Sequence, residues 1–148
     1  MIKNERQYAV TKTQADKFAQ ALAELTRRSP GKGHPLLRKA EEEALRSQFA
    51  DLQAEMAEYD ALRSGKRKHL PVTSFDDLPR TLIQARIAAG LSQKELARRL
   101  GLKEQQIQRY EATDYASAKL SRLRAVMHAL GIELRMESVL VAEDGDEG

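Results

Sequence analysis

The sequence predicts an all-α fold that ends in one short β-strand. Two observations lead to this prediction. Apolar residues recur at spacings of three and four over two long stretches of the first half. In the second half, glycines end three of four short segments that have helical patterns. Charged residues make up 32% of the chain and aromatic residues 5%, so we expect a modest, aliphatic core. The expected order is a helical hairpin, a bundle of four short helices, and the strand.

The first helix of the hairpin is predicted over residues 14–28, with Thr13 as its N-cap. Four apolar residues repeat along one face of this segment: Ala15, Phe18, Leu22 and Leu25. Residues 29–33, with the sequence Ser-Pro-Gly-Lys-Gly, are expected to end the helix and turn the chain.

The second helix of the hairpin is predicted over residues 35–64. Its apolar residues repeat at spacings of four and three, as in a coiled-coil seam: Leu45, Phe49, Leu52, Met56 and Tyr59. Packing within the chain explains this stripe, and so does a coiled coil with a second copy or a partner protein. A basic segment follows at residues 65–69, either as a solvated linker or as an arm that touches a nucleic-acid backbone. We place the first domain boundary after residue 70.

Residues 71–131 are predicted to form a second domain of four short helices. The helices are expected at residues 78–89, 92–101, 104–111 and 118–130. Asp76 or Asp77 is expected to cap the first of them. Ser92 and Glu95 have the spacing of a capping box, in which two side chains and two backbone N–H groups bond reciprocally.

Residues 132–148 form the third predicted segment. Apolar and polar residues alternate at the start of residues 132–141, which predicts a strand. A lone strand needs a partner, so we expect either pairing with the same strand of a second copy or a short extended tail on the bundle. Residues 143–148 contain no apolar residue and are expected to be disordered.

The most informative segment spans residues 91–111. An inward-facing set of apolar residues is expected on its two helices: Leu96, Ala97, Leu100, Ile107 and Tyr110. Ala97 is small, as required where two helices cross steeply at close range. Gly101 supplies the turn between them, because glycine adopts a left-handed backbone conformation at little cost. Leu102 is expected to fill the turn.

With those residues buried, the second of these helices presents a polar outer face. Glutamine can pair with adenine through two hydrogen bonds in the major groove, and arginine can pair with guanine in the same way. The start of the preceding helix can hold a phosphate through its free backbone N–H groups. The predicted DNA-binding residues are Ser92, Gln93, Lys94, Lys103, Glu104, Gln105, Gln106, Gln108, Arg109 and Lys119.

Residues 78–131 resemble the Xre family of helix-turn-helix regulators, which includes lambdoid phage repressors and many antitoxins. The resemblance rests on five groups of residues: Leu91-Ser92-Gln93, Glu95-Leu96-Ala97, Leu100-Gly101, Ile107 and Glu111. It implies a helical bundle that inserts its third helix into the major groove, and a dimer that binds a palindromic operator. It also implies an internal ion pair between Arg86 and Glu111.

Two positions depart from the family pattern. Lys103 stands where the family often has a small hydroxyl residue that caps the recognition helix, and Glu104 places an acid at the groove-facing start. The segment from Gly131 to Glu137 resembles the antitoxin that pairs with the HipA kinase. In that antitoxin a C-terminal strand from each subunit pairs across the dimer axis. The N-terminal hairpin matches no family pattern that we identify.

Other classes of protein are disfavoured by the sequence. The three histidines are isolated, no hydrolase, metalloprotease or phosphate-loop motif occurs, and cysteine is absent, so we expect no enzyme, no metal and no cofactor. Neither a transmembrane segment nor a secretion signal is visible, which predicts a cytoplasmic protein without membrane contact. All 25 basic residues lie within the first 136 residues, and a basic surface favours polyanions.

The sequence therefore predicts a dimeric, sequence-specific DNA-binding repressor that is autoregulatory, with a toxin protein as a further partner if it is an antitoxin. The alternative is an interaction module whose main role is to neutralise a partner protein, with DNA binding secondary. The side chains of Arg122 and Arg124 are expected either to touch phosphates or to face solvent.

Overall fold

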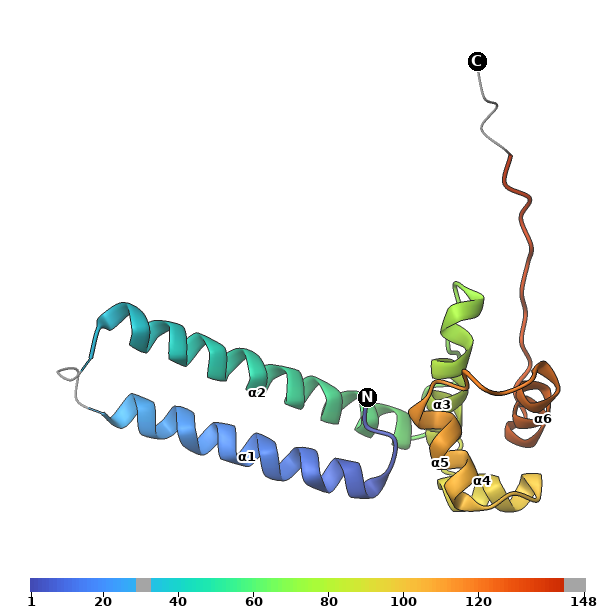
Figure 1. The fold of residues 1–148 in the computed structure, drawn as a ribbon, viewed down its shortest axis with the longest axis horizontal. Helices are drawn as coiled ribbons and strands as arrows, with labels where there is room; N and C mark the ends of the chain where they lie inside the picture. The colour runs from blue at the N-terminus through green and yellow to red at the C-terminus, as the bar shows by residue number, and fades with distance from the viewer. Residues whose placement is uncertain (29–32, 143–148) are drawn as a thin grey trace.

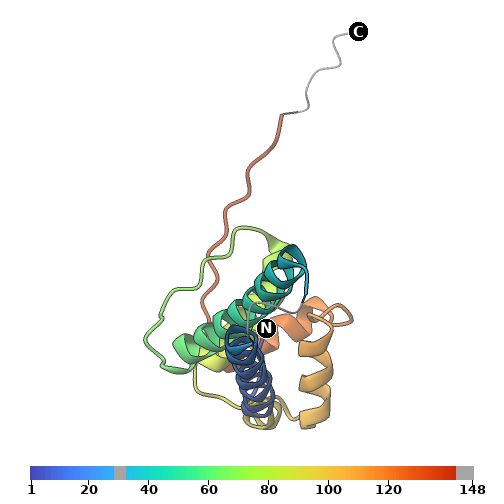
Figure 2. The ribbon, with the colours of Figure 1, turned by 90° about the vertical axis from the view of Figure 1, so that its left-hand side faces the viewer.

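The computed structural model describes residues 1–28 and 33–142, which form helices, the loops that join them and an extended C-terminal segment (Figure 1). The elements are α1 (Glu5–Arg27), α2 (Pro35–Arg63), the 3₁₀ turn η1 (Phe75–Asp77), α3 (Leu78–Ala88), α4 (Gln93–Leu100), α5 (Glu104–Ala112) and α6 (Leu120–Leu130). Helices α1 and α2 lie side by side and project from the bundle formed by the other four (Figures 1 and 2). The predicted all-α architecture of hairpin and bundle is confirmed for the described residues.

Helix α1 begins at residue 5 rather than at the predicted residue 14. The side chain of Asn4 caps it by accepting a hydrogen bond from the backbone N–H of Gln7, at 2.8 Å. Thr13, the predicted cap, lies inside the helix, where its hydroxyl donates to the carbonyl of Ala9. The prediction was wrong because the first turn of α1 has little apolar periodicity of its own and is held by contacts with the bundle.

Helix α2 has the predicted extent, and the two apolar stripes of the hairpin face each other. Ala15 and Leu25 of α1 are buried, as are Tyr59 and Leu62 of α2, and the remaining stripe residues are half-buried. Tyr8 and Tyr59 pack ring against ring with centroids 5.4 Å apart. Within the chain, the stripes are therefore used to pack α1 against α2.

The short helices of the bundle begin and end close to their predicted positions. The capping box at the start of α4 is confirmed: Ser92 Oγ accepts from the N–H of Glu95 at 3.0 Å, and the Glu95 carboxylate accepts from the N–H of Ser92 at 2.8 Å. Gly101 ends α4 with a φ of +68°, a left-handed conformation that disfavours other residues. The predicted turn is confirmed.

Two helix starts differ from the prediction. Neither aspartate caps α3 directly: the side chain of Ser74 starts the preceding 3₁₀ turn by accepting from the N–H of Asp76, and Asp77 makes no capping bond. Helix α6 begins at residue 120 rather than 118, because the N–H of Ala118 bonds to the carbonyl of Tyr115 and extends the preceding turn.

The hairpin and the bundle share one hydrophobic core. Ile2, Tyr59 and Leu62 belong to the same buried cluster as the central bundle residues, which include Leu82, Ile83, Leu96, Ile107 and Val126. In the basic link between them, Arg67 pairs with Glu58 at 2.8 Å. The hairpin therefore rests on the bundle along buried apolar surface.

The predicted C-terminal strand is absent from the described part of the chain. Ile132 and Leu134 pack partly on the core, but beyond them the chain runs out from the bundle, and Met136 and Leu140 are 54% and 97% exposed (Figure 1). The prediction was wrong because a strand requires hydrogen bonds to a neighbouring strand, and the described residues offer none. The tail predicted to be disordered lies outside the described residues.

Candidate nucleic-acid interface

A buried ion pair fixes α5 to α3. Arg86 Nε and Nη2 each donate to a Glu111 carboxylate oxygen at 2.7 Å, and both side chains are at most 3% exposed. The two parallel bonds set the orientation of the guanidinium as well as its position. The ion pair implied by the family resemblance is confirmed, and Arg86 is unavailable to DNA.

Gln93 belongs to the same buried network. Its Nε2 donates to Glu111 Oε1 at 3.0 Å, and its Oε1 accepts from Asn4 Nδ2 at 3.1 Å. The side chain is only 5% exposed, so the expected contact of this side chain with DNA is not available in this structure. Gln93 instead ties the start of α4 to the end of α5. The backbone N–H groups of Gln93 and Lys94, which the capping box does not use, remain as phosphate donors.

Helix α5 presents one face to the core and another to solvent. Ile107 and Glu111 are fully buried, at 0% exposure. Apart from Ala112, the exposed residues of α5 and of its N-cap are the ones expected to bind DNA: Lys103, Glu104, Gln105, Gln106, Gln108 and Arg109. These six side chains, the predicted reading face, are exposed, whereas Gln93, predicted to bind DNA from the start of α4, is buried. Their contact with DNA stays a prediction.

Three of these exposed side chains have local roles that the sequence alone left open. Gln106 Oε1 accepts from the backbone N–H of Lys103 at 2.9 Å and so supplies the capping bond that a lysine cannot. Gln108 Nε2 lies 3.4 Å from Glu104 Oε1, one turn apart on α5. Gln105 and Arg109 have no such partner among the described residues, so their side chains are free to extend from the exposed face of α5.

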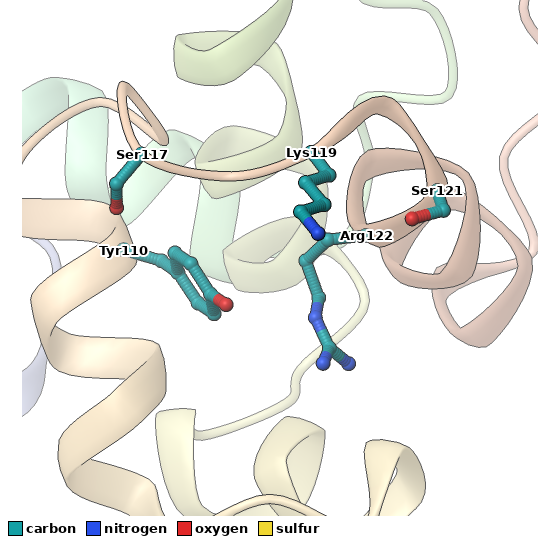
Figure 3. Close-up of a pocket in the computed structure, with 5 residues that line it drawn as sticks. All are labelled: Tyr110, Ser117, Lys119, Ser121 and Arg122. Atoms are coloured by element: carbon teal, nitrogen blue, oxygen red, sulfur yellow. The ribbon is translucent and has the colours of Figure 1, made fainter.

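A polar hollow lies beside α5, lined by Tyr110, Ser117, Lys119, Ser121 and Arg122. The side chains of Lys119, Arg122 and Tyr110 converge on it from α5 and the start of α6 (Figure 3). The lining provides two cations and three hydroxyl groups, and it contains no carboxylate. These groups are suited to binding a phosphate.

Only Lys119 of this set was predicted to bind DNA, and Arg122 was left open. Tyr110 was expected to hold the helix down, and its ring does stack on Tyr115 at 5.5 Å and 3° between planes. Ser117 and Ser121 carried no recognisable signal, because the turn between α5 and α6 brings them to the hollow. Burial, reinforced by the nearby Glu111 charge, raises the pKa of Tyr115 and keeps it neutral.

Residues 82–136 match a family of known proteins described as Helix-turn-helix. They form a helix-turn-helix domain. The match covers a little over a third of the chain and runs from α3 to the segment after α6, so it includes every residue of the reading face and the polar hollow. No curated protein and no solved structure gave a match. The helix-turn-helix domain supports a DNA-binding regulator.

Two other features are absent from the part of the chain that the structure describes. No group of three or more histidine, aspartate or glutamate side chains there is placed to hold a metal ion. None of the described helices is long and apolar enough to cross a membrane.

Proposed function

We propose that the protein is a sequence-specific transcriptional repressor that binds the DNA upstream of its own gene. The observation that carries this proposal is the arrangement of α5. Its inner side is held by a fully buried ion pair, and its outer side presents Gln105 and Arg109 to solvent. A rigid helix with free glutamine and arginine side chains is suited to reading base edges.

In this mechanism α5 enters the major groove. Arg109 donates to a guanine and Gln105 pairs with an adenine, while Lys119 and Arg122 neutralise a phosphate beside the groove. A dimer places two such helices in successive major grooves, about 34 Å apart on a palindromic operator. Repression follows because the bound dimer blocks access to the promoter.

The experiment is a gel-shift with the purified full chain and its own upstream DNA, in ~150 mM salt, against an excess of random-sequence DNA. The proposal expects a complex that survives the competitor. A Gln105→Ala/Arg109→Ala variant should lose this complex, and a variant at Arg27, on the far end of α1, should keep it. Loss of the wild-type complex to random competitor would contradict autoregulation.

A second candidate function is that of an antitoxin, which neutralises a partner protein as well as binding DNA. The observation in its favour is the hairpin, which projects from the helix-turn-helix domain and exposes Leu36 and Leu37 at 70% and 72% (Figure 1). The test is to express the neighbouring gene with and without this chain. Growth arrest that only this chain relieves supports the antitoxin, and a harmless neighbour argues for a plain repressor.

A further inference from the structure

A second hollow lies on the opposite side of α5 from the polar hollow of Figure 3. It is formed between the first turns of α1 and the recognition helix, and its lining includes Arg6, Gln7, Gln93 and Gln108. Gln108 lines this hollow and Tyr110 lines the other. Because two residues span about 200° of an α-helix, the hollows flank α5 on opposite sides.

Hydrogen bonds and burial hold residues 2–4, just before α1, beside this hollow. Lys3 Nζ donates to the carbonyl of Glu111 at 2.8 Å, and Arg86 Nη2 donates to the carbonyl of Lys3. Asn4, the cap of α1, bonds to Gln93. Ile2 is buried in the shared core at 4% exposure. The start of α1 is therefore held in place relative to the recognition helix, although it lies outside residues 82–136.

Among the charged groups near this hollow, one cation has no partner within the described part of the chain. Glu5 is paired with Arg63 at 2.8 Å, and Glu55 lies 3.8 Å from the N-terminal amino group of Met1. Lys3 is engaged by the end of α5. Arg6 is exposed, and it forms no ion pair or side-chain hydrogen bond with any other residue that the structure describes.

We propose that the first turn of α1 belongs to the DNA interface and that Arg6 contacts the phosphate backbone there. A helix that lies in a major groove has a sugar-phosphate strand on each side, so a cation on either flank of the helix can contact a phosphate. Lys119 and Arg122 serve one strand, and Arg6 serves the other, beside the phosphate donors at the start of α4. This proposal rests on the DNA binding proposed above and extends the interface beyond the helix-turn-helix domain.

The test measures affinity against salt concentration for the full chain. The probe is a fluorescein-labelled duplex of ~30 base pairs, selected by the wild-type protein from a random-sequence pool and titrated by anisotropy between ~50 and 200 mM salt. Arg6→Gln is compared with Arg6→Lys, which keeps the charge, and with Arg27→Gln, at the far end of the same helix. Arg122→Gln reports on the opposite flank.

Each lost phosphate contact reduces the slope of log K against log salt by about 0.9 and weakens binding about fivefold at ~150 mM salt, and a bound dimer loses two such contacts, one from each subunit. We expect this change for Arg6→Gln, recovery for Arg6→Lys, and no change for Arg27→Gln. If Arg122→Gln weakens binding while Arg6→Gln does not, the Arg6 contact is refuted and the DNA-binding function stands. If the wild-type protein selects no duplex, both proposals fail. Far-UV circular dichroism checks that each variant is folded.

Discussion

At the scale of single residues, the Arg86–Glu111 pair decides the geometry of the reading face. A charge can be buried only when its hydrogen bonds are satisfied. Here the Glu111 carboxylate accepts from Arg86 and from Gln93, and Arg86 also donates to the carbonyl of Leu91. The same network that satisfies these groups joins α3, α4 and α5. The buried side chains of this network therefore set the position of α5.

Removal of one partner of this pair should be costly. Arg86→Ala leaves the Glu111 carboxylate buried without its counter-charge, and we expect a loss of about 3–5 kcal/mol in the free energy of unfolding. Urea titration followed by far-UV circular dichroism measures it. The matched control is Arg46→Ala, which breaks an exposed pair with Glu42 and should cost less than about 1 kcal/mol. Equal losses in the free energy of unfolding would show that the buried pair stabilises the fold no more than the exposed one.

A base-reading residue should be distinguishable from a phosphate-binding one. Arg109→Ala is expected to weaken binding to the operator by about 1–3 kcal/mol, because a guanine loses its bidentate partner, with little change on random DNA. Competition anisotropy with both duplexes measures the difference. An equal loss on operator and random DNA would remove Arg109 from the base readers and make it a backbone contact.

At the scale of helices, the start of α1 shows how a helix end is set by its surroundings. Asn4 caps α1 and bonds to Gln93, while Glu5 in its first turn binds both Arg63 and Tyr59 of α2. Arg63 in turn lies over the Tyr59 ring, 5.4 Å from its centroid. The first turn of α1 thus contacts the bundle on one side and α2 on the other.

This cluster should make the hairpin sensitive to alkaline pH. Burial, together with the adjacent Glu5 carboxylate, raises the pKa of Tyr59 to about 12. A pKa above the ordinary value near 10 means that folding favours the neutral phenol, so this contribution is complete below about pH 10 and is lost as the pH rises towards 12.

The urea midpoint of the wild-type protein should therefore fall between about pH 10 and 12 more steeply than that of Tyr59→Phe, which has no phenol to ionise at this position. Circular dichroism at a series of pH values provides the midpoints for both proteins. If the urea midpoints of the two proteins fall in parallel over this pH interval, the raised pKa of Tyr59 is refuted.

At the scale of the whole molecule, the hairpin and the helix-turn-helix domain are coupled through one core. Ile2 and Leu62 lie in the same buried cluster as Leu96 and Ile107. The N-terminal residues therefore pack with the recognition helix, although the two are far apart in the sequence. A partner that moved the hairpin would disturb α5.

Ile2→Ala tests this coupling. Truncation of a buried isoleucine should cost about 2–5 kcal/mol, and the loss should speed hydrogen exchange at the amides of α5 as well as those of α1. Val10→Ala, at a position 53% exposed, is the control and should change stability by at most about 0.5 kcal/mol. Faster exchange in α1 alone would mean that the two parts are uncoupled.

The sequence by itself determined the features that depend on near neighbours in the chain. The capping box of Ser92 and Glu95, the glycine turn after α4, the extent of α2 and the buried face of α5 all follow from spacing and local backbone chemistry. The exposed residues of α5 could be predicted because its apolar residues are confined to one face.

Only the tertiary structure decided features that join distant segments. The start of α1, the burial of Gln93 and the hollow beside Tyr110 each depend on residues brought together by the fold. The expected strand at residues 132–141 was wrong for the same reason: alternation can indicate an extended chain, but a strand exists only where another backbone pairs with it. Periodicity in the sequence predicts which face of a helix or strand is apolar. Only tertiary packing determines which residues contact that face.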